Sequence, residues 1–105
     1  MKEYTVDCWD IKKSTVQVGD TAYVEGQTSW FGNSTLIKAD KIVNKTRNGP
    51  TCECGEPDLN TKMKIGEAET SLKTKIFTKD IKKTGVVTEV TETEDGFWFK
   101  MEVDE

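Results

Sequence analysis

The sequence contains no histidine, and this absence limits the chemistry open to the protein. Histidine is the most frequent general base, the usual partner of a catalytic serine or cysteine, and a common zinc ligand. The glycines fall singly at turns, so no phosphate-binding glycine motif precedes a helix. Carboxylates are plentiful, but none lies on the inward face of a well-patterned strand, where burial would raise its pKa for acid–base work. We therefore expect no catalytic residues and no enzyme.

Long apolar runs are also lacking. No run approaches the 18 or so apolar residues of a membrane span, and the start Met1-Lys2-Glu3-Tyr4 has no apolar region of the kind found in signal peptides. These features predict a cytoplasmic protein with no membrane partner. The three cysteines are an odd number, and a reducing compartment makes a disulfide framework improbable.

The composition favours strands over helices. Only 34% of the residues are apolar and 32% are charged, whereas 15 of the 105 are threonine. Threonine suits a pleated surface with one face in water, so the composition indicates an all-β fold. A chain of this length has room for one core, and we expect a single domain over residues 1–105.

Negative charge is concentrated near the end of the sequence. The net charge is −4, and residues 89–105 carry seven acidic groups against the single Lys100. An acidic protein repels the phosphates of nucleic acids and anionic membranes, so the charge opposes generic binding to either. It favours a basic or amphipathic protein partner instead. The sequence does not show the oligomeric state.

Alternating apolar residues predict a small barrel. The patterns place strands or half-strands at residues 4–8, 16–18, 22–24, 35–46, 63–65 and 67–75, a helical turn at 78–85, and a hairpin at 86–103 whose turn is at 92–96. The strand at 35–46 changes its apolar parity and must bend. The expected fold is an SH3-like or OB-like barrel of five to seven short strands with at most one helical turn. Its expected core contains Phe97, Phe99, Met101, Val18, Val24 and Val43.

One stretch resembles a known group of proteins. It begins with Val18-Gly19-Asp20-Thr21-Ala22-Tyr23-Val24, continues through an aromatic-Gly-Asn loop, and ends with Lys41-Ile42-Val43-Asn44-Lys45-Thr46-Arg47-Asn48-Gly49. It resembles the small SH3-like β-barrel proteins of bacteriophage accessory genes and their bacterial relatives. The resemblance covers residues 15–49. It implies a fold and no active site, since most of these proteins have no assigned chemistry.

Cys52-Glu53-Cys54-Gly55 is the only stretch with a pattern like that of a metal site. Structural zinc sites need four ligands, usually from two cysteine pairs, and here the second pair is missing. Cys8 and a carboxylate such as Asp58 could complete a site. The alternative is two exposed thiols on a loop. We expect no metal and no cofactor, and a zinc-stabilised barrel remains an alternative.

Nucleic-acid binding is a second alternative. Lys38, Lys41, Lys45 and Arg47 lie along the strand at 35–46, near the aromatic loop. Basic groups beside aromatic rings are typical of single-strand binding surfaces. Lysines on an exposed strand also protect a sheet edge from pairing, however, and the acidic end of the chain repels phosphate. The balance is against nucleic acid.

The main functional hypothesis is a protein-binding surface around Trp98. Strict alternation of Phe97, Phe99, Met101 and Val103 forces Trp98 and Glu102 to the opposite face of the strand. Acidic residues nearby form a rim, and the full set expected to bind a partner is Trp98, Glu92, Glu94, Asp95, Glu102, Trp30 and Phe31. Covering of Trp98 by the 51–75 segment is the alternative. For Trp30 and Phe31 the alternative is that one ring closes an end of the barrel. The expected function is that of a non-enzymatic binding module, such as a phage accessory protein that modulates a host protein.

Overall fold

The computed structural model describes residues 1–8, 16–29, 34–46, 52–53, 60, 62–65, 68–71, 77–93 and 96–105. These residues form strands and turns, and none of them lies in a helix. The strands are β1 (Lys2–Cys8), β2 (Thr21–Ser29), β3 (Leu36–Asn44), β4 (Cys52–Glu53), β5 (Lys62–Ile65), β6 (Ala68–Ser71), β7 (Phe77–Thr93) and β8 (Gly96–Val103). The all-β prediction is confirmed.

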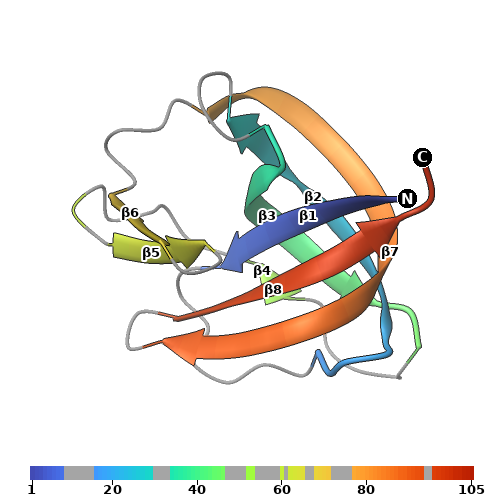
Figure 1. The fold of residues 1–105 in the computed structure, drawn as a ribbon. Helices are drawn as coiled ribbons and strands as arrows, with labels where there is room; N and C mark the ends of the chain where they lie inside the picture. The colour runs from blue at the N-terminus through green and yellow to red at the C-terminus, as the bar shows by residue number, and fades with distance from the viewer. Residues whose placement is uncertain are drawn as a thin grey trace.

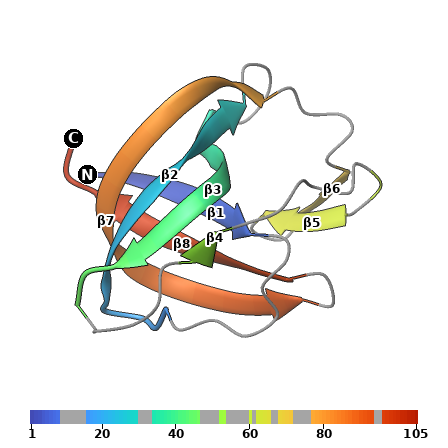
Figure 2. The same cartoon turned by 180° about the vertical axis from the view of Figure 1, so that it is seen from behind.

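Five strands close a small barrel in the order β1-β8-β7-β2-β3. The neighbours pair antiparallel, and a parallel pairing of β1 with β3 closes the circle. β7 curves around the barrel while β8 and β1 cross one side of it, and β2 and β3 form the other side (Figure 1, Figure 2). β4 extends the sheet beyond β3, and β5 and β6 form a separate hairpin. The predicted small SH3-like or OB-like barrel is thus confirmed.

The barrel core comes from alternate residues of these strands. On β8 the inward side chains are Phe97, Phe99, Met101 and Val103, and the rings of Phe97 and Phe99 stack with centroids 6.0 Å apart. Val24 also lies in the core, as predicted. Burying these side chains removes apolar surface from water, which is the main favourable term in folding.

Val18 and Val43 are the two core predictions that were wrong. Val18 is 64% exposed because it lies in a turn before β2, where Gly19 has a φ of +92°. The predicted strand at 16–18 is therefore absent, although Val16 is buried. Val43 is only half-buried, because the pairing of β2 with β3 skips Asp40 and turns Ile42 into the core instead. Such a bulge reverses the inward parity of the strand, as the predicted bend requires.

The predicted helical turn at 78–85 is wrong. These residues belong to β7, which pairs with β2 from Phe77 to Val86. Gly85, read as the residue that ends a helix, sits where β7 and β8 approach closely: a Cβ there would lie 2.5 Å from the carbonyl oxygen of Glu102. Pairing with a neighbouring strand overrode the weak local helical pattern.

Candidate functional site

The outer face of the barrel formed by β7, β8 and β1 contains the residues on which the sequence hypothesis depends. Cross-strand pairing arranges the outward side chains of these strands in three rows. The first row is Val86, Glu102 and Glu3, the second is Glu89, Lys100 and Thr5, and the third is Thr91, Trp98 and Asp7. The rows differ in exposure and charge.

Two members of the third row, Trp98 and Asp7, are buried. Trp98 is 3% exposed although it faces away from the barrel core, so it does not form an exposed aromatic anchor as hypothesised. Its indole Nε1 is buried and makes no hydrogen bond. Asp7 is buried beside it, which corrects the expectation that no carboxylate is buried. Burial raises the pKa of Asp7 to about 7, and a hydrogen bond from the backbone of Cys8 opposes that rise.

In the second row, the opposite charges of Lys100 and Glu89 neutralise each other. The ammonium nitrogen of Lys100 lies 3.5 Å from a carboxylate oxygen of Glu89, and 5.8 Å from the centre of the Trp98 ring. Lys100 therefore contacts both an acid of the second row and the aromatic ring of the third. One of the acidic groups counted in residues 89–105 is thus already paired.

The first row is exposed and acidic. Val86 is 47% exposed in the middle of the sheet, where Thr21 of β2 pairs with it on one side and Glu102 of β8 on the other. Glu102 is half-buried and Glu3 is exposed. Met1 and Asp104 adjoin this row and line a shallow hollow of about 380 Å³ with Val86 and Glu102. No basic side chain is among the described residues that line it. We call Met1, Glu3, Val86, Glu102 and Asp104 the Val86 face.

Of the predicted partner-binding residues, the Val86 face includes Glu102. Glu92 is exposed but pairs with Phe97 near the turn between β7 and β8, at the other end of the hairpin from Glu102. Glu94, Asp95, Trp30 and Phe31 lie outside the described residues. The sequence analysis missed Val86 as a surface residue. The available signal was the pair Val86-Val87, because adjacent residues of a strand point to opposite faces and one of them had to point outward.

The basic residues of β3 do not form an isolated positive patch. Lys41 pairs with Glu25 on one side and with Glu53 on the other, so two carboxylates flank it across the sheet. The ammonium of Lys45 lies 5.3 Å from the centre of the Tyr23 ring. Arg47 lies outside the described residues. Carboxylates on both sides of a lysine weaken its attraction for phosphate, which is unfavourable for nucleic-acid binding.

Cys8 is disulfide-bonded, which overturns the expectation that a disulfide is improbable. The side chains of Cys52 and Cys54, the other two cysteines, are not described. A sulfur in a disulfide is not a thiolate, so Cys8 in this state cannot complete a zinc site. The residues that the structure describes contain no cluster of three metal-binding side chains.

Comparisons with protein-family models, curated proteins and solved structures found no match to this chain. In the described part of the chain, no helix is long and apolar enough to span a membrane.

Proposed function

We propose that this protein is a non-enzymatic binding module that docks a protein partner through the Val86 face. The observation that carries the proposal is the row Val86, Glu102 and Glu3, in which an exposed apolar residue lies beside two carboxylates on a regularly paired sheet. Because Val86 is paired on both sides, its exposure is not a consequence of a frayed strand. An apolar contact with a charged rim is the usual composition of a protein interface.

The charges specify the kind of partner. Glu3, Glu102 and Asp104 place three carboxylates on the face, and no basic side chain is among the described residues that line its hollow. A partner segment with an apolar side chain and flanking lysines or arginines would complement it. The resemblance of residues 15–49 to phage accessory barrels supports a further proposal, that the partner is a host protein in the cytoplasm. The disulfide of Cys8 argues against a cytoplasmic location, because disulfides are rare in the reducing cytosol.

The remaining chemistry supports binding rather than catalysis. Asp7, the described carboxylate whose pKa burial raises, lies directly opposite Trp98, whose indole has no acid–base or nucleophilic role. A general base needs a reacting group within hydrogen-bond reach. We therefore propose no reaction for this site.

Photo-crosslinking tests the proposal. We would place a photoreactive benzoylphenylalanine at position 86 in one variant and at exposed position 40 of β3 in a second, matched variant, and irradiate each in cell lysate. One adduct specific to position 86 is expected. The crosslinked partner, once purified, should bind the wild type and the Asp40→Asn control equally. It should bind the Val86→Ser, Glu102→Gln double variant about tenfold more weakly, because a tenfold change in affinity corresponds to the loss of a contact worth about 1.4 kcal/mol.

Salt dependence gives a second readout. Binding should weaken as the salt concentration rises, because exposed charges are screened at about 10 Å in 0.1 M salt. Equal affinity for the wild type and the double variant, or adducts at position 40 alone, would show that the Val86 face is not the interface. Retention of oligonucleotides that Lys41→Ala abolishes would favour the nucleic-acid alternative.

A further inference from the structure

The open end of the barrel near the start of β1 forms a second hollow, separate from the Val86 face. Its volume is about 610 Å³, and the inward-facing Tyr4 lies at its base. The charged residues that line it are Lys2, Lys79, Lys82, Lys83, Asp80 and Glu105. We call this hollow the barrel mouth. The mouths of β-barrels are frequent sites of small-molecule binding.

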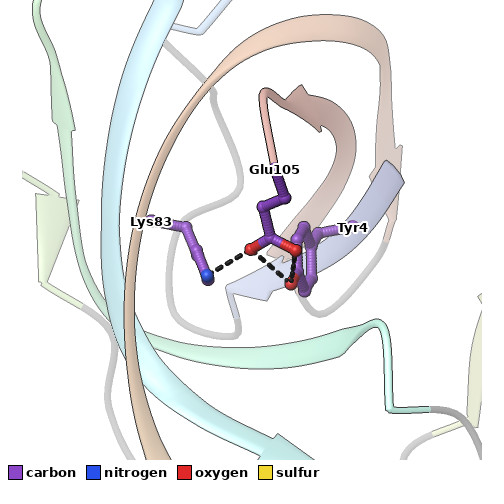
Figure 3. Close-up of polar contacts among 3 residues, drawn as sticks. All are labelled: Tyr4, Lys83 and Glu105. Carbon is purple, nitrogen blue, oxygen red and sulfur yellow. Dashed lines mark hydrogen bonds and ion pairs between the residues drawn. The ribbon is translucent and has the colours of Figure 1, made fainter. Parts of the chain in front are cut away.

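A carboxylate of the protein itself occupies the barrel mouth. The hydroxyl of Tyr4 donates to both carboxylate oxygens of Glu105, at 2.9 and 3.0 Å, and the ammonium of Lys83 forms an ion pair with the same carboxylate (Figure 3). The ammonium groups of Lys2 and Lys83 lie 5.2 and 5.8 Å from the centre of the Tyr4 ring. Tyr4 is 3% exposed, so burial of its ring fixes the position of the hydroxyl.

The electrostatics favour an ionised carboxylate at this point. The hydrogen bonds from Lys83 and Tyr4 lower the pKa of Glu105, and the bond to Glu105 raises the pKa of Lys83. The aromatic hydroxyl and the lysine thus act together as a receptor for a group with two oxygen acceptors. The group that they hold here is a carboxylate.

The carboxylate of Glu105 does not balance the positive charge of the barrel mouth. Four lysines line the mouth, against Asp80 and Glu105, so the charges of the lining side chains sum to +2 (four positive minus two negative groups) with Glu105 in place. Without the Glu105 side chain this sum would be +3. A cationic hollow in a protein of net charge −4 concentrates anions locally. The volume is also far larger than one carboxylate needs.

Glu105 is held in a way that permits its release. It lies two residues beyond β8, which ends at Val103, and neither Asp104 nor Glu105 belongs to a strand. Both Glu105 and Lys83 remain accessible to water, and ion pairs in such positions contribute little to folding.

We propose that the barrel mouth binds a small organic di- or tricarboxylate. One carboxylate of the ligand takes the place of Glu105 on Tyr4 and Lys83, and its other carboxylates contact Lys2, Lys79 or Lys82. Glu105 then acts as a tethered competitor that limits binding to ligands carrying more than one negative group. The proposal is independent of the Val86 face, so either can fail without the other.

Calorimetric titration with citrate at low salt tests this assignment. We would compare the wild type with Glu105→Ala, and use Glu89→Ala, at an exposed position outside the mouth, as a control with the same change of charge. Glu105→Ala should bind citrate about tenfold more tightly than the wild type, because a site occupied nine-tenths of the time by its own side chain loses that factor in apparent affinity. Glu89→Ala should bind like the wild type.

Second-site variants identify the receptor groups. Both variants are made in the Glu105→Ala background. Tyr4→Phe keeps the buried ring and removes only the hydroxyl, and Lys83→Met removes the charge while keeping the side-chain length. Each should weaken citrate binding severalfold and leave the melting temperature unchanged. Equal affinities for Glu105→Ala and Glu89→Ala would overturn the proposal. An unchanged citrate affinity after Tyr4→Phe would also overturn it, and so would tighter binding of inorganic phosphate than of citrate.

Discussion

Asp7 and Trp98 lie directly opposite each other on β1 and β8, and both are buried on the outer side of the barrel sheet. The carboxylate has a raised pKa and the indole nitrogen has no hydrogen-bond partner. A buried carboxylate and a buried N–H group without a hydrogen bond each have a cost in folding free energy. This pair is therefore expected to lower the stability of the protein around neutral pH.

Stability should fall as pH rises through the titration of Asp7. Its pKa is about 7 in the folded protein, against a normal value of 3.8, so the folded state binds more protons than the unfolded state between those pH values. The unfolding free energy then decreases with pH across this window, by at most roughly 4 kcal/mol. Asp7→Asn should remove this slope in urea unfolding measured from pH 4 to 8, and Asp104→Asn should keep it. Identical slopes for wild type and Asp7→Asn would contradict the assignment.

Phe99 should be among the most costly core residues to truncate. It is fully buried and stacks on Phe97. Phe99→Ala should lower the unfolding free energy by about 3–5 kcal/mol, whereas Val18→Ala at an exposed turn should change it by less than about 0.5 kcal/mol. Thermal or urea denaturation measures both. A small effect at Phe99 would mean that the inward parity of β8 is wrong.

Gly85→Ala should disrupt the pairing of β7 with β8. The added methyl group would lie 2.5 Å from the Glu102 carbonyl oxygen, which is a backbone atom and cannot rotate away. We expect a loss of about 1–3 kcal/mol, typical of overpacking. Amide hydrogen exchange should show faster exchange around Val86 and Glu102. Unchanged exchange in a stable variant would show that the two strands can separate slightly at no cost.

Reduction should destabilise the protein. A disulfide restricts the unfolded chain, and its removal typically costs about 2–4 kcal/mol. We expect dithiothreitol to lower the melting temperature of the wild type and to leave that of Cys8→Ala unchanged. Peptide mapping without reduction identifies the partner of Cys8. Three free thiols in the purified native protein would exclude the bond.

Metal removal should have no effect. We expect the apo mass in native mass spectrometry and an unmoved melting temperature in excess chelator. One bound zinc that is lost on replacing Cys52 and Cys54 with serine would revive the zinc-stabilised alternative.

Regular alternation made part of this fold predictable. Phe97, Phe99 and Met101 alternate strictly, so their strand and inward face followed from the sequence. Val43 was misplaced because a one-residue bulge at Asp40 reverses parity, and the sequence shows that a bend is needed without showing where it occurs.

The candidate sites were harder to predict than the core. Alternation correctly turned Trp98 away from the barrel interior, yet it is buried, because exposure of an outer face depends on what packs over it. The contact of Glu105 with Tyr4 joins residues at opposite ends of the sequence and has no local pattern at all. Only the strand order brings those two residues together.

The parallel pairing of β1 with β3 has a consequence for how the protein folds. β1 needs both β3 and β8 as neighbours, and β8 is the last strand in the sequence. Pairing between such distant segments has a high entropic cost, and proteins dominated by it fold in milliseconds to seconds. During synthesis β1 is made before β8 and gains its second neighbour only when β8 has been made. Of the five barrel strands, the earliest to be synthesised is thus among the last to be fully paired.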